Sequence, residues 1–136
     1  MKLNMFISFN GNCREAVEFY AKVFKSEVQE LMTYADMPPD PDFTPAEIDK
    51  NKVMYTHITF GNMTLMFMDY TSCMEFVAGN NIQPSVSTTI DEVTRIFNEL
   101  KEGGTVDCEL MKTFYSELYG CVTDKFGVTW HILHSH

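Results

Sequence analysis

Two histidines within strand-like segments are the side chains best suited to ligand binding or proton transfer. His57 lies in the alternating segment 52–60, and His131 lies in the alternating segment 128–134. An imidazole can hold a metal ion, exchange a proton near neutral pH or hydrogen-bond a ligand. Because side chains alternate along a strand, His131 lies on the strand face opposite Trp130. A hydrogen-bonded interior histidine with no role in binding is the alternative interpretation for each.

Methionine is unusually abundant, with 10 residues among 136. Several of them cluster in the segment 63–69, with Met66 at its centre. Because the methionine side chain is flexible and polarisable, such a cluster indicates either an adaptable core or a pliable apolar pocket for a ligand. The sequence leaves both interpretations open.

The chain has four widely spaced cysteines, Cys13, Cys73, Cys108 and Cys121. They form no C-x-x-C pair, which argues against a zinc ribbon or a thioredoxin-like motif. A core of this size does not need disulfide bonds, so we expect free thiols in a reducing compartment.

The net charge of −9 restricts the partners that the chain can bind. Nucleic acid and anionic membranes both require a basic face, so we expect neither as a partner. The longest apolar runs are too short to span a bilayer, and the first residues do not have the pattern of a signal peptide. These features predict a cytoplasmic protein.

The elements that must position these side chains follow the same order in each half of the chain. In the first half, Asn12 and Glu15 form a predicted capping box at the start of a helix with apolar residues at helical spacing. A proline-rich loop spans 36–51, where prolines exclude regular strands and helices. The predicted elements are a strand at 3–9, a helix at 13–24, a strand at 28–34 and hairpin strands at 52–60 and 63–69.

The second half repeats this pattern. Thr89 and Glu92 form a second predicted capping box before an apolar helical stripe that ends at a glycine pair. The predicted strands are 84–88, 105–110, 118–123 and 128–134. The order β-α-β-β-β therefore occurs twice, in modules at about 1–70 and 82–134 of one domain spanning 1–136. Because each sheet can place only one face on its own helix, we expect curved mixed sheets to enclose a cleft between the modules.

Three stretches carry a family resemblance that covers about residues 3–134. They are Phe9-Asn-Gly-Asn-Cys13-Arg-Glu-Ala16-Val-Glu-Phe19-Tyr20, Gly61-Asn-Met-Thr-Leu65-Met-Phe-Met-Asp69 and Tyr119-Gly-Cys-Val-Thr-Asp124-Lys-Phe126-Gly127-Val-Thr-Trp130-His-Ile132. The chain resembles the vicinal oxygen chelate superfamily, which includes glyoxalase I, extradiol dioxygenases and the fosfomycin and bleomycin resistance proteins, and within it the PhnB-like branch. The resemblance implies an α+β, glyoxalase-like fold and a homodimer.

The resemblance also implies where a metal site would lie. Superfamily enzymes similar to glyoxalase I hold a divalent metal with one residue, usually His or Glu, from each of four cleft strands. The matching positions in this chain are Met5, Met66, Ser85 and His131. Only His131 is a suitable donor, since thioether sulfur does not replace a carboxylate for a hard or borderline ion. The resemblance therefore implies that the usual metal site is dismantled, and we predict no metal ligands and no cofactor.

These observations predict a small-molecule-binding protein of the PhnB-like type. The predicted ligand contacts are Met5, His57, Met66, Ser85, Tyr115 and His131, with Tyr115 stacking on a flat ligand at the mouth of the cleft. The alternative is a lyase, isomerase or dioxygenase-type enzyme, either with a divalent metal at a rearranged site or with His131 as a general base. The chain has no glycine-rich strand-to-helix loop of the kind that holds a nucleotide-like cofactor.

Overall fold

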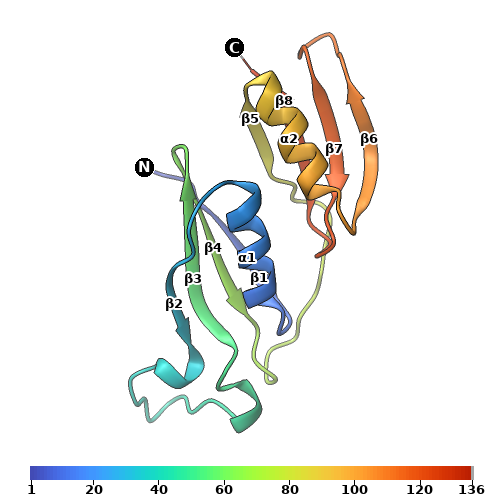
Figure 1. The fold of residues 1–136 in the computed structure, drawn as a ribbon. Coiled ribbons are helices and arrows are strands. Elements are labelled where there is room, and N and C mark those ends of the chain that lie inside the picture. The colour runs from blue at the N-terminus through green and yellow to red at the C-terminus, as the bar shows by residue number, and fades with distance from the viewer. Residues whose placement is uncertain (136) are drawn as a thin grey trace. The chain divides into compact units, whose positions relative to one another are not determined.

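The computed structural model describes residues 1–135 of the chain as two compact units. The first unit is Met1–Val77, and the second begins at Ala78. Each unit contains one α-helix and one four-stranded mixed sheet (Figure 1). The predicted α+β class with two β-α-β-β-β repeats is confirmed.

The first unit contains a sheet with the strand order β1-β4-β3-β2. Its β1 and β4 strands are parallel, and the other neighbours are antiparallel. The elements are β1 (Met5–Phe9), α1 (Cys13–Val23), β2 (Gln29–Thr33), β3 (Val53–Phe60) and β4 (Met63–Asp69), with short 3₁₀ turns at Tyr34–Asp36 and Glu47–Asp49. The turns lie at the ends of the proline-rich loop. Between these turns the loop contains no regular helix or strand, as its composition predicts.

The second unit has the corresponding strand order, β5-β8-β7-β6, and again pairs its first and last strands in parallel. The elements are β5 (Ser85–Thr88), α2 (Ile90–Leu100), β6 (Thr105–Met111), β7 (Tyr119–Thr123) and β8 (Thr129–His134). Among residues 1–135, no helix is long and apolar enough to cross a membrane.

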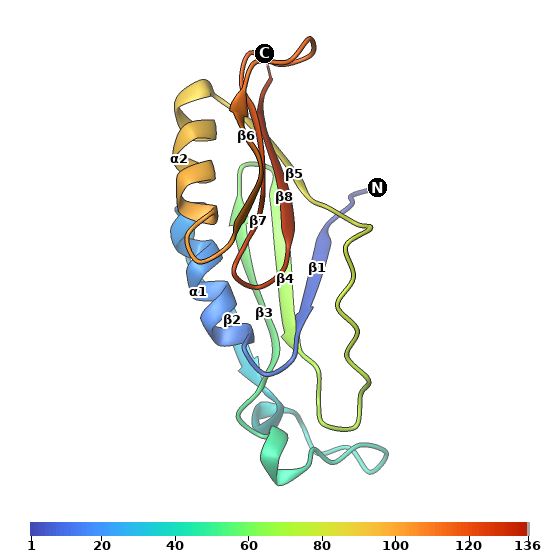
Figure 2. The ribbon, with the colours of Figure 1, turned by 90° about the vertical axis from the view of Figure 1, so that its right-hand side faces the viewer.

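Each helix packs its apolar stripe on one face of its own sheet (Figure 2). In the first unit, the ring of Tyr20 stacks on Phe67 of β4 with a centroid separation of 5.7 Å. In the second unit, Phe97 of α2 lies against β7, where Gly120 leaves room for it. A Cβ atom added to Gly120 would lie 2.7 Å from a ring carbon of Phe97. This close approach requires glycine on the strand.

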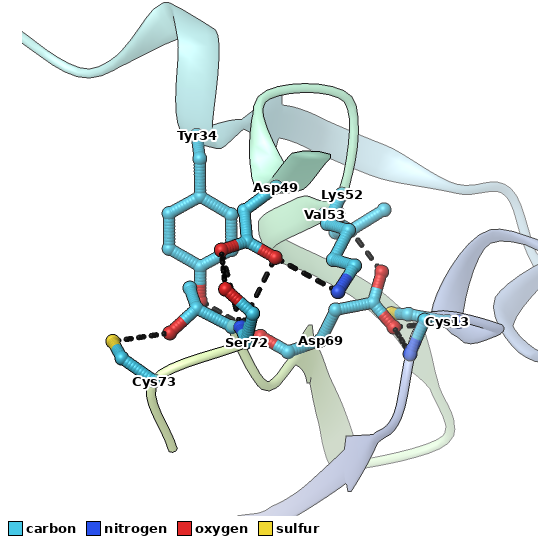
Figure 3. Close-up of polar contacts among 10 residues, drawn as sticks. Cys13, Tyr34, Asp49, Lys52, Val53, Asp69, Ser72 and Cys73 are labelled. Atoms are coloured by element: carbon cyan, nitrogen blue, oxygen red, sulfur yellow. Dashed lines mark hydrogen bonds and ion pairs between the residues drawn. The ribbon is translucent and has the colours of Figure 1, made fainter. Parts of the chain in front are cut away.

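The start of α1 is capped by a side chain far away in the sequence, and the predicted cap at Asn12 is wrong. The Asn12 side chain makes no capping hydrogen bond. Instead, the buried carboxylate of Asp69 on β4 accepts hydrogen bonds from the backbone N–H groups of Gly11 and Cys13, both at 2.9 Å (Figure 3). A carboxylate supplies both the acceptor and the negative charge that a helix N-terminus favours.

The second helix begins as the sequence predicts. The Thr89 side chain accepts a hydrogen bond from the backbone N–H of Glu92 at 3.4 Å. The Glu92 carboxylate also accepts hydrogen bonds from the guanidinium of Arg95, one turn further along α2. This i, i+3 ion pair adds local support to the helix.

A buried polar network holds the loop end of the first unit against its sheet (Figure 3). The second carboxylate oxygen of Asp69 accepts from the backbone N–H of Val53, and its backbone carbonyl accepts from the Tyr34 hydroxyl at 2.7 Å. Asp49, at the end of the loop, accepts hydrogen bonds from the backbone N–H and the hydroxyl of Ser72. It also forms an ion pair with Lys52. The hydrogen bond from Lys52, followed by that from the Ser72 side chain, lowers the pKa of Asp49.

Candidate ligand-binding face

The face of each sheet that lies away from its own helix carries the candidate site residues, and we call it the open face of that sheet. In the second sheet, Trp130 and Ile132 are buried on the helix side of β8. His131 alternates with them and therefore lies on the open face. The register pairs His131 with Ser85 of β5 on one side and with Cys121 of β7 on the other. Side chains at paired positions share a face, so these three residues form a row across three strands.

His131 is held at both ring nitrogens. Its Nδ1 lies 2.7 Å from the hydroxyl of Tyr119, and its Nε2 lies 2.6 Å from the side-chain carbonyl oxygen of Gln83. Tyr119 comes from β7, and Gln83 lies two residues before the start of β5. Two neighbouring segments therefore fix the orientation of the imidazole.

The Tyr119 phenol is a hydrogen-bond donor at neutral pH. Burial, followed by the charges of Cys121 and Tyr115, raises the pKa of the Tyr119 phenol to about 12. The phenol therefore keeps its proton at neutral pH and can donate it to Nδ1 of His131. The Oε1 atom of Gln83 is an acceptor, so the Nε2–H of His131 donates to it.

Aromatic rings continue the site beyond Tyr119. Tyr115 packs edge-on against Tyr119 with a centroid separation of 6.0 Å, and Phe114 packs edge-on against Tyr115 at 5.0 Å. Tyr115 is 56% exposed, so much of its ring is open to a ligand. Exposed aromatic rings with hydroxyl groups offer both a stacking surface and a polar contact.

The open face of the first sheet has a related arrangement. On β3, the Tyr55 hydroxyl lies 3.2 Å from Nδ1 of His57, and the register pairs His57 with Met66 of β4. Phe6 of β1 pairs with Met66 and lies 6.4 Å from the Tyr55 ring, measured between centroids. This face therefore combines one imidazole with aromatic and thioether side chains.

The predicted position of Met5 beside Met66 is wrong. The register of β1 against β4 pairs Met5 with Leu65 and Phe6 with Met66. Leu65 is buried on the helix side, so Met5 lies on the face that α1 covers. Phe6 reaches the open face in its place, and it is 47% exposed.

Within their own units, five of the six predicted residues lie with the candidate site residues, and Met5 does not. Ser85, Tyr115 and His131 belong to the second unit, and His57 and Met66 belong to the open face of the first. Sequence reasoning missed two partners of the imidazoles, Tyr55 and Tyr119. Both tyrosines could have been found from alternation, since each stands two residues before a paired open-face position. Gln83 lies in a polar connection and carries no such signal.

The donor set does not fit the divalent metal site of the superfamily. In the part of the chain that the structure describes, no three His, Cys, Asp or Glu side chains are placed to share a metal ion. Among the matching positions, Met66 offers a soft thioether, and Phe6, which takes the place of Met5 on the open face, offers no donor atom. His131 offers an imidazole whose two nitrogens already have protein partners. We therefore derive no step through a metal.

Comparison with known proteins agrees with the fold. The chain is 29% identical to the solved protein PA1353 from Pseudomonas aeruginosa, with a TM-score of 0.89 and coverage of 99% of this chain and 98% of that one. It is 22% identical to a putative 3-demethylubiquinone-9 3-methyltransferase, the PhnB protein from Bacillus cereus, with a TM-score of 0.78 and coverage of 99% and 100%. The same fold occurs at 9% identity in the fosfomycin resistance protein FosX from Listeria monocytogenes, with a TM-score of 0.64 and coverage of 98% and 91%.

The repeated β-α-β-β-β units and these neighbours define an α+β protein with the glyoxalase-like fold. The chain belongs to the family described as 3-demethylubiquinone-9 3-methyltransferase, the PhnB-like branch, which matches residues 1–133. Among curated proteins, it is 27% identical to YjdN from Escherichia coli over 97% of this chain and 94% of that protein.

Proposed function

We propose that this chain binds a small molecule on the open face of its second sheet, at a site centred on His131. The observation that carries the proposal is the imidazole of His131 held between Tyr119 and Gln83 on a face that its own helix leaves uncovered. Side chains in such an arrangement are already oriented, so a ligand loses less entropy in ordering them.

The chemistry of the face favours a ligand with a flat, partly apolar body and at least one hydrogen-bonding group. Tyr115 and Tyr119 supply ring surface, and the contacts among Tyr119, His131 and Gln83 can be exchanged for contacts to ligand atoms. Ser85 adds a hydroxyl in the same row as His131. Sites of this kind combine an apolar lining with a few placed polar groups.

General-base catalysis by His131 is the alternative function, and the same contacts weigh against it. A general base needs a ring nitrogen that reaches the proton it removes. Nδ1 is within hydrogen-bonding distance of the Tyr119 hydroxyl, and Nε2 is within hydrogen-bonding distance of Gln83, so neither nitrogen is without a partner. No carboxylate orients the ring through these two hydrogen bonds, so the arrangement suits recognition better than proton abstraction.

The residues also give no support for methyl transfer, although the family description contains that activity. The turn between β1 and α1 is where a backbone cradle for a cofactor would be sought. Its N–H groups at Gly11 and Cys13 are already bonded to Asp69. We therefore base the proposal on ligand binding, and we derive no methyl-transfer step.

Native mass spectrometry of the protein isolated from its source without denaturation tests this proposal. We expect a non-covalently bound small molecule, or binding of a compound from a metabolite library. The adduct should be lost in His131→Ala and retained in Asn98→Ala, a control on the exposed side of α2. Absence of any adduct from both the isolated protein and the library screen would contradict the proposal, as would an adduct that His131→Ala retains at full occupancy.

A further inference from the structure

Two of the four cysteines stand opposite each other on neighbouring strands of the second sheet. Cys108 of β6 and Cys121 of β7 are register partners in an antiparallel pair. Partners of this kind have Cα atoms about 4.5–5.5 Å apart. A disulfide bond spans Cα separations of about 4.4–6.8 Å, a range that includes the spacing of partners in a regular ladder.

The local backbone directs both side chains to the open face. The register of β6 shifts on each side of Cys108, which shows an irregularity or bulge at this point of the strand. Before it, Asp107 accepts a hydrogen bond from the Thr123 side chain at 2.7 Å. After it, Met111 places its sulfur 3.7 Å from the Cys108 sulfur. Thr123 follows Cys121 by two residues, and Met111 pairs with Tyr119, which precedes Cys121 by two residues. Both therefore lie on the open face, and the contact with Met111 places Cys108 on that face.

The backbone around Cys108 can adjust to bring its sulfur to Cys121. β6 is an edge strand, bonded to β7 on one side only. Bulges interrupt the ladder and bend an edge strand, so a small movement of β6 requires little disruption. The Cys108 sulfur is half-buried, and its hydrogen-bond contacts are with the Glu109 carbonyl, at 3.5 Å, and with Met111. No aromatic ring or charged group locks it in place among these contacts.

We propose that Cys108 and Cys121 form a dithiol site that exchanges with low-molecular-weight disulfides and closes to an intrachain disulfide bond. The Cys108 thiolate attacks one sulfur of the small disulfide, which releases one thiolate and leaves a mixed disulfide on Cys108. Cys121 then attacks the Cys108 sulfur and releases the second thiolate. The protein loses two protons and two electrons, and the small disulfide is reduced to two thiols.

The environment assigns the order of these steps. Cys121 is only 6% exposed, and burial together with the charge of Asp107 raises the pKa of its thiol. A buried thiol of this kind is a poor first attacker. Cys108 is the more accessible of the two, so it meets the external disulfide first, and Cys121 resolves it at short range.

Peptide mapping tests this inference without knowledge of the small-molecule ligand. The reduced protein is incubated with glutathione disulfide, its remaining thiols are alkylated, and it is digested with trypsin without reduction. Cleavage after Lys101, Lys112 and Lys125 separates the two cysteines into peptides 102–112 and 113–125. We expect these peptides to appear as one species linked by a disulfide bond, and the thiol content of the unfolded protein to fall from four to two.

Variants make the test specific. Cys73→Ser removes an exposed thiol outside the pair and should leave the linked species unchanged. Cys108→Ser should abolish it. Three results in the wild-type map would each overturn the inference. They are a stable mixed disulfide of Cys108 with glutathione, a disulfide bond to Cys73, and separate alkylated peptides 102–112 and 113–125. Because the wild-type map decides the question, the result stands even where a variant folds poorly. It is also independent of whether the His131 face binds a ligand.

Discussion

Replacing Asp69 with asparagine should strongly destabilise the first unit, because one buried carboxylate joins three separate backbone segments. Asp69 is 1% exposed and accepts from the N–H groups of Gly11, Cys13 and Val53 at 2.9, 2.9 and 3.0 Å. The remaining oxygen of Asn can still serve Gly11 and Cys13. Its amide group, however, is a donor, and it faces the N–H of Val53 with no acceptor between them.

The magnitude follows from these contacts. An unpaired buried N–H costs about 1–3 kcal/mol. Loss of the charge weakens the two remaining hydrogen bonds, since charge-assisted bonds are roughly twice as strong as neutral ones. It also removes a favourable interaction with the N-terminus of α1, worth about 0.3–1 kcal/mol. We expect Asp69→Asn to lower the free energy of unfolding by about 3 kcal/mol, taking these effects together.

Urea denaturation followed by far-UV circular dichroism measures this loss directly. Asp42→Asn is the matched control, because Asp42 is exposed in the proline-rich loop and its substitution should change the stability by less than about 0.5 kcal/mol. An Asp69→Asn variant as stable as the control would refute the idea that this carboxylate anchors the helix, the loop and the sheet together.

Three further predictions follow from particular side chains. Gly120→Ala should lower the free energy of unfolding by about 1–3 kcal/mol, since the new Cβ would overlap the Phe97 ring. In the control Gly79→Ala, the nearest atom to the new Cβ lies at 3.7 Å, so the stability should be unchanged in the same denaturation assay. The raised pKa of Tyr119, about 12, means that the neutral phenol contributes stability below pH 10 that is lost as the pH rises from 10 towards 12. Wild type should therefore lose more stability than Tyr119→Phe over that interval, and parallel curves would contradict this. Burial, followed by the charge of Asp69, raises the pKa of the Cys13 thiol to about 12. Cys13 should therefore resist a thiol-specific reagent at pH 8 in the folded protein and react with it once urea unfolds the chain. Rapid labelling of Cys13 in the native state would show that its site opens easily.

The sequence predicts the elements well because their signals are local. Alternation locates the strands, helical spacing locates both helices, and Thr89 caps α2 through a neighbour three residues away. The cap of α1 could not be found in this way. Its acceptor, Asp69, lies 56 residues after Cys13, so Asn12 looks like the better candidate until the sheet is assembled.

The candidate site is less predictable because it depends on strand register. A shift of one residue moves a side chain to the other face of a sheet, and this is the difference between Met5 and Phe6. Alternation does place His131 opposite Trp130, since that relation lies within one strand. The contacts of His131 with Tyr119 and Gln83 join three segments, and no local pattern predicts which side chains will meet there.

The central claim is that a small molecule binds at a site centred on His131. Its most direct test is the affinity of the protein for the compound that native mass spectrometry identifies. Isothermal titration calorimetry should compare wild type with His131→Ala, Tyr119→Phe and the control Asn98→Ala. Loss of one hydrogen-bonding partner costs about 0.5–1.5 kcal/mol, so the account predicts binding up to about tenfold weaker for Tyr119→Phe and weaker still for His131→Ala, with the control unchanged. Equal affinity in wild type and His131→Ala would show that the ligand binds elsewhere.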